Sequence, residues 1–168
     1  MLLTARHLFV RAAAVAAFAC GLAATAAHAL EARQVEAVVT VLEQLASETG
    51  NTVFYDEDAA EEWFEADDES SRLIPAAGFT RSTWKEAFDQ TMTGFLASIP
   101  QAELERMMED FMNEIGEVGR MTPQQKQEAT DALRAEMGRF ETIRERGAQH
   151  RGVVAPYGPR LRRISLRD

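Results

Sequence analysis

Cysteine, lysine and histidine are scarce in this chain of 168 residues. It contains one cysteine, Cys20, two lysines, Lys85 and Lys126, and three histidines. Nucleophilic catalysis by serine or cysteine needs a histidine beside the nucleophile, and a conventional zinc site needs several histidine or cysteine ligands. The sequence also lacks the G-x-S-x-G, G-x-x-x-x-G-K-[ST] and G-x-G-x-x-G motifs. These absences argue against a triad hydrolase, a zinc enzyme and a nucleotide-binding protein.

Basic residues are also fewer than acidic residues. The chain has 18 lysines and arginines against 27 aspartates and glutamates, which gives a formal net charge of −9. A general nucleic-acid binder needs a basic face, so no nucleic-acid partner is expected. Hydrophobic residues make up 46% of the chain and charged residues 27%, a balance typical of a globular protein of one domain.

Residues 1–29 have the pattern of a secretory signal peptide. Arg6 and Arg11 form a positive start, an uncharged apolar run covers residues 12–24, and Ala27-His28-Ala29 is a small-x-small cleavage signal. The apolar run is shorter than the roughly 20 residues that a transmembrane helix needs. We therefore expect a mature chain that begins near Leu30, is periplasmic or secreted, and has no transmembrane span. Cys20 would leave with the signal peptide, so no disulfide is expected.

The rest of the sequence predicts helices. Apolar residues recur at steps of three and four over residues 31–48, 84–99, 104–115 and 129–143, with a shorter helix near 58–66. Capping boxes are predicted at Thr83 with Glu86, at Ser98 with Gln101, and at Thr122 with Gln125. The expected fold is all-α, a bundle of about four amphipathic helices over residues 30–147, followed by an Arg-rich C-terminal tail, residues 148–168.

Nine of the 14 residues from Asp56 to Glu69 are acidic, and none is basic. Three interpretations stay open. The segment is a solvated face, a weak calcium site built from clustered oxygens, or an electrostatic partner surface, including one for the chain's own Arg-rich tail. Sequence spacing does not distinguish them.

Methionine is the most distinctive residue of the predicted helices. Six methionines follow residue 29: Met92, Met107, Met108, Met112, Met121 and Met137. They are in phase with other apolar residues, which predicts core packing. Two alternatives are an adaptable surface that binds client proteins and a Cu(I) site of thioethers.

The tail carries Arg160, Arg162 and Arg163, interspersed with Leu161 and Ile164. The pattern favours a short helix that packs on the bundle through its apolar residues. The same arginines are candidates for weak contact with an anionic surface, such as lipid head groups or cell-wall polymers.

The segment Met121-Thr122-Pro123-Gln124-Gln125 is similar to the L-T-x-x-Q motif of the small helical periplasmic chaperones of the Spy/CpxP type. The resemblance covers five residues, with methionine in place of leucine, and implies an exported, cysteine-poor, all-helical protein. A helix cap alone accounts for Thr122 and Gln125. Those chaperones tend to present a basic surface, whereas this chain is acidic, so no family is assigned from the motif.

The combined prediction is an exported helical protein that acts by protein binding, as a chaperone-like or envelope accessory factor. Its partner would be another envelope protein or an unfolded client. No catalytic residue, metal site or cofactor is assigned. The expected partner-binding residues are Met107, Met108, Phe111, Met112, Arg160, Arg162 and Arg163. Two alternatives remain, a carboxylate-dependent hydrolase or lyase that acts on cell-wall glycan, and a weak Ca²⁺ or Cu(I) binder.

Overall fold

The computed structural model describes residues 30–165, and the predicted signal peptide, residues 1–29, lies outside the described residues. The described chain is all-helical, without a strand, as predicted. Eight α-helices and two short 3₁₀-helices follow one another: α1 Ala32–Thr49, α2 Ala59–Asp68, α3 Leu73–Ala76, α4 Arg81–Ser98, α5 Gln101–Glu117, α6 Pro123–Gly147, η1 Ala148–His150, α7 Arg151–Val154, η2 Ala155–Tyr157 and α8 Gly158–Ser165.

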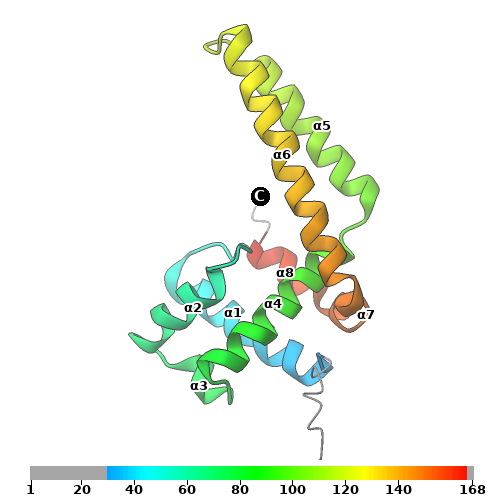
Figure 1. Ribbon diagram of the computed structural model, residues 1–168. Coiled ribbons are helices and arrows are strands. Elements are labelled where there is room, and N and C mark those ends of the chain that lie inside the picture. Colours follow the sequence, from blue (N-terminus) through cyan, green and yellow to red (C-terminus); the bar gives the residue numbers. More distant parts are fainter. Residues whose placement is uncertain (1–29, 166–168) are drawn as a thin grey trace, which may run out of the picture.

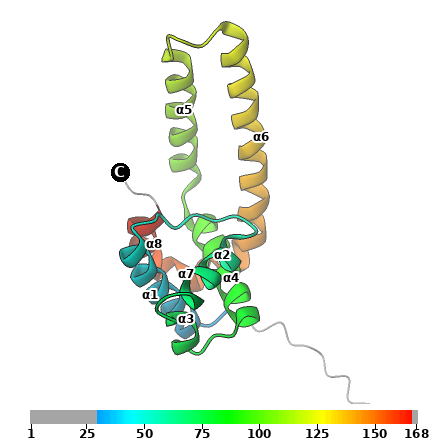
Figure 2. The same ribbon diagram turned by 90° about the vertical axis from the view of Figure 1, so that its left-hand side faces the viewer.

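The helices form two parts, which Figures 1 and 2 show from two sides. The first, here called the base, contains α1–α4, α7 and α8 with the two 3₁₀-helices, and holds nearly all of the buried apolar side chains. The second is the hairpin, α5 and α6 with the connecting residues 118–122, which projects from the base. The four long helices therefore do not pack as the single bundle that the sequence suggested.

Helix α1 shows how the amphipathic pattern produces the base. Its valines and leucines at steps of three and four are almost completely buried, as predicted from their spacing. Gly50 ends the helix with a φ of 72°, and its backbone N–H donates to the carbonyl of Ala46. A left-handed φ of this kind favours glycine, so the sequence places the end of α1 correctly.

Two predicted helix starts were wrong by a few residues. Helix α4 begins at Arg81, and its N-cap is Thr80, with Thr83 as the third helical residue of the box. Helix α5 begins directly after Pro100 instead of being capped by Ser98, whose hydroxyl donates to the carbonyl of Phe95. In α4 the neighbouring Thr80 forms the box in place of Thr83, whereas α5 has no side-chain cap at all. The third start was right, because Thr122 caps α6 with Pro123 as its first residue.

The segment that was predicted as an Arg-rich tail is helical up to Ser165 and packs on the base. Val154, Leu161 and Ile164 belong to the core, and the carbonyl of Ile164 accepts a hydrogen bond of 2.8 Å from the backbone N–H of Val53. Helix α8 lies against α1, so the two ends of the described chain close the base together (Figure 1).

Asp67 is the one fully buried carboxylate in residues 30–165. Its two oxygens accept hydrogen bonds of 2.8 Å from the backbone N–H groups of Leu73 and Ile74, which begin α3. These first N–H groups of a helix have no partner inside the helix, so Asp67 satisfies them. Part of the acidic segment 56–69 is therefore structural, while most of its other carboxylates are exposed.

The hairpin crosses the base at two glycines. A Cβ atom added to Gly147 would lie 2.1 Å from the carbonyl oxygen of Thr93, and one added to Gly94 would lie 2.9 Å from the Cβ of His150. The backbones of α4 and the end of α6 touch here. The contact fixes where the hairpin leaves the base.

Within residues 30–165, no helix is both long enough and apolar enough to cross a membrane.

Candidate functional site

The hairpin is the part of the structure that leaves apolar side chains without a full covering. Helix α5 has one buried residue, Leu104, and α6 has one, Gly147, and both lie at the base. At a rise of 1.5 Å per residue, α5 is about 25 Å long and α6 about 37 Å. Most of this length is packed only against the other helix of the pair.

We call the apolar side chains that recur at helical spacing along the two helices the hairpin surface. It is formed by Met107, Met108, Phe111, Met112 and Ile115 of α5, and by Leu133, Met137 and Phe140 of α6. None of these side chains is buried, and Phe111 is 54% exposed. Apolar side chains that gather in one exposed patch, unlike those scattered singly on a surface, mark interaction sites. The hairpin surface is therefore a candidate binding site.

The structure places the four predicted partner-binding residues of α5 together. Met107 and Phe111 are four residues apart and share one side of the helix, and Met108 and Met112 share the adjacent side. The three methionines are half-buried. Their role in binding remains a prediction. The residues of α6 that complete the surface were recognised in the sequence as an apolar stripe, but nothing there linked them to α5.

One arginine joins the hairpin to the base. The Arg144 side chain is 14% exposed and donates to the carbonyls of Leu96, at 3.2 Å, and Ile99, at 2.9 Å, beside the end of α4. It also contacts Gln101 at 2.9 Å and Glu141 at 3.0 Å. Since the last carbonyls of a helix lack partners within it, this guanidinium satisfies them and fixes the root of both hairpin helices.

The three predicted arginines of the tail have partners within the chain. Arg160 donates to Glu43 and Glu36, each at 2.7 Å, and Arg162 donates to Glu103 of α5 at 3.0 Å. Arg163 is 72% exposed and lies 3.4 Å from Glu43. These ion pairs hold α8 against α1 and against the root of the hairpin, away from the hairpin surface. None of them involves the acidic segment 56–69, which was one predicted partner of the tail.

The Arg160 ion pairs lead to a prediction of pH dependence. Hydrogen bonds from Arg160 lower the pKa of Glu43, and of the more exposed Glu36, below the ordinary value of 4.5. A lowered pKa in the folded state stabilises the fold above the unfolded-state pKa, and this contribution is lost as the pH falls through the folded-state value. We expect Arg160→Gln to lower the free energy of unfolding by about 1–2 kcal/mol at pH 7.

The measurement is urea unfolding at several pH values. The difference between wild type and Arg160→Gln should shrink as the pH falls below 4.5 and level off at a smaller value once both glutamates are protonated, since Arg160 also donates to Thr40. Arg163→Gln is the control, with an effect within about 0.5 kcal/mol because that side chain is exposed. A difference for Arg160→Gln that is constant with pH would contradict the assignment.

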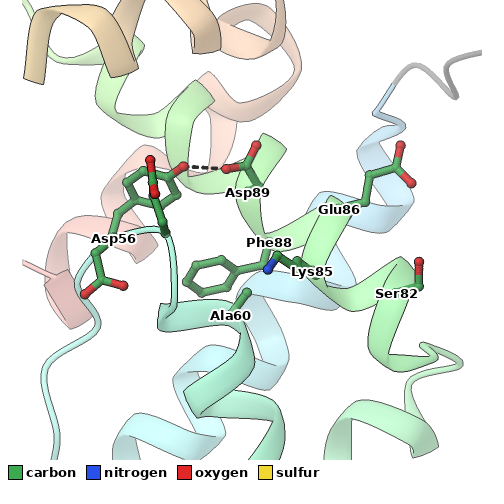
Figure 3. Close-up of a pocket in the computed structure, with 9 residues that line it drawn as sticks. Asp56, Ala60, Ser82, Lys85, Glu86, Phe88 and Asp89 are labelled. Carbon is green, nitrogen blue, oxygen red and sulfur yellow. Dashed lines mark hydrogen bonds between the residues drawn. The ribbon is translucent and has the colours of Figure 1, made fainter. Parts of the chain in front are cut away.

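A second candidate is a hollow of about 370 Å³ between α4 and the segment before α2. Its lining includes Ala60 of α2 and Lys85, Phe88 and Asp89 of α4, and Figure 3 shows Phe88 pointing towards Ala60. The hydroxyl of Tyr55 donates to Asp89 and accepts a hydrogen bond from Arg146. The described residues that line this hollow include no histidine or cysteine.

The polar side chains at this hollow hold parts of the fold together. Burial, followed by the hydrogen bond to Asp89, raises the pKa of Tyr55, so its hydroxyl keeps its proton near neutral pH. The Tyr55–Asp89–Arg146 contacts join the segment after α1 to α4 and the end of α6. His150 lies near the α4–α6 crossing, where burial lowers its pKa. Among the described residues, no group of three or more His, Cys, Asp or Glu side chains is placed to hold a metal ion.

Comparison with protein-family models, with curated proteins and with solved structures found no match to this chain.

Proposed function

We propose that this chain is an exported helical protein that acts by protein binding, and that it binds through the hairpin surface. The observation that supports the proposal is a projecting pair of helices whose Met, Leu and Phe side chains are left partly exposed. Unbranched methionine side chains adapt to irregular partners, which suits an unfolded client or an envelope protein. The signal-peptide pattern of residues 1–29 supports export.

Two exposed phenylalanines provide the test. Phe111 on the hairpin is 54% exposed and Phe54 on the base is 53% exposed, so they form a matched pair. We expect Phe111→Ser to weaken binding of an unfolded, reduced and alkylated polypeptide by about tenfold, because central aromatic side chains dominate interfaces. Phe54→Ser should leave the affinity unchanged. The measurement is a fluorescence anisotropy titration with protein purified after expression of the full chain in a bacterial host.

Three results would count against the proposal. Equal affinity loss in both variants would contradict binding through the hairpin, and no binding by the wild type would contradict the binding function. Recovery of the protein from the host cytosol with residues 1–29 intact would contradict export. Circular dichroism of both variants provides the control for folding, since both positions are on the surface.

A further inference from the structure

The charge along the hairpin is unevenly distributed between its two helices. Helix α5 carries six acidic side chains and one basic side chain, whereas α6 carries five of each. On α6, Arg134, Arg139 and Arg144 pair with acids of the same helix. On α5, among the described residues, Glu103 is the one acid with an ion pair, to Arg162 of α8. The other five acids of α5 have no ion pair among the described residues and form an acidic border beside the apolar residues.

The apolar part of α5 is also wider than α6 covers. At 100° per residue, the positions from Met107 to Met112 spread over roughly 140°, whereas the α6 stripe of Ala129, Leu133, Met137, Phe140 and Ile143 spreads over roughly 120°. The α6 stripe is the narrower of the two, and Phe111 of α5 remains more than half exposed. The uncovered part is an apolar strip along α5 whose side chains stay partly exposed.

From these two observations we infer that the occupant of the hairpin surface is a cationic amphipathic polypeptide segment, which lays its apolar side on Phe111 and the methionines and its lysines or arginines against the acids of α5. The inference rests on the proposed function of the hairpin and names the class of its partner. Acidic, methionine-rich grooves that take up basic amphipathic helices use the same combination of adaptable apolar contact and charge complementarity.

The same charges disfavour the other candidate occupants. A second copy of the chain would bring a second α5, with its six acids, towards the first, and like charges across an interface repel each other. An anionic lipid surface would meet the same repulsion. A basic segment is the occupant that neutralises the border while it covers the apolar residues.

The test uses two synthetic helical peptides with one apolar pattern, whose polar positions are all lysine in one and all glutamate in the other. We expect the lysine peptide to bind the full-chain protein at least about tenfold more tightly at low salt, with an advantage that shrinks as salt screens the charges. Asp110→Asn combined with Glu114→Gln should weaken the lysine peptide about fivefold. The control is Glu62→Gln combined with Glu69→Gln on the base, which changes the net charge by the same amount and should leave the affinity for the lysine peptide unchanged.

The outcomes separate this inference from the proposed function. Equal binding of both peptides, lost in Phe111→Ser, would overturn the cationic partner and leave the binding function in place. Absence of binding by either peptide, together with failure of the unfolded polypeptide to bind, would overturn both. A concentration-dependent dimer in analytical ultracentrifugation that Phe111→Ser abolishes would identify a second copy as the occupant and overturn the inference. Selective binding that only the hairpin variants weaken supports it.

Discussion

Replacing Gly147 with alanine is expected to destabilise the fold by about 3 kcal/mol or more, because the added carbon has no space. It would lie 2.1 Å from the carbonyl oxygen and 2.3 Å from the carbonyl carbon of Thr93. Both atoms belong to the backbone of α4, so a side-chain rotation cannot relieve the overlap. The φ of Gly147 is −78°, which suits any residue, so the cost comes from the helix crossing and not from the backbone conformation.

Gly138 provides the matched control within the same helix. A Cβ atom at Gly138 meets nothing within 4 Å. Alanine favours a helix interior over glycine, so Gly138→Ala should stabilise the protein by about 0.5–1 kcal/mol. Urea unfolding followed by circular dichroism gives both values. Equal stability of the two variants would mean that α4 and α6 do not cross as closely as described.

Replacing Trp84 with alanine is expected to lower the free energy of unfolding by about 4 kcal/mol, the largest effect of any side chain considered. Trp84 is completely buried, and its ring centroid lies 5.7 Å from those of both Phe79 and Phe88. Its indole N–H donates to the carbonyl of Ala60 at 2.9 Å and so joins α4 to α2. Alanine removes the aromatic contacts, the hydrogen bond and most of the volume at once.

Trp84→Phe separates these contributions. It keeps an aromatic ring in the core but loses the hydrogen bond to Ala60 and some volume, so we expect a loss of about 1–2 kcal/mol. Phe54→Ala, at an aromatic residue that is 53% exposed, should change stability by less than about 1 kcal/mol. Thermal and urea unfolding of the three variants are the measurements. A loss in Trp84→Ala no larger than that in Phe54→Ala would contradict the central position of Trp84.

The sequence predicts most of the helices well and their arrangement poorly. The period of apolar residues depends on local geometry alone, so it locates α1 and the greater part of α6. The same period cannot say which apolar stripe packs on which. In the sequence, Gly147 is only the last residue of the predicted helical region, whereas the structure shows that its missing side chain allows α6 to cross α4.

The candidate site could be predicted only in part, because the apolar period does not say which side of a helix is covered by another. The amphipathic spacing identifies Met107, Met108, Phe111 and Met112 as one apolar side, but a buried side and an open one have the same pattern. The position of that side on a projecting hairpin, and so its exposure, depends on tertiary packing. The ion-pair partners of Arg160 and Arg162 could not be predicted from the sequence either, because Glu36, Glu43 and Glu103 are far from the tail in sequence.

The contact between α1 and α8 has a consequence for the order of events during synthesis. The valines of α1 are among the first of the described residues to be made, whereas Leu161 and Ile164, which help to cover the same core, are among the last. A nascent chain cannot close this core until its final helix has emerged. For an exported protein, as we propose, this delay keeps the polypeptide unfolded and able to thread through a translocation channel, with folding completed on the far side.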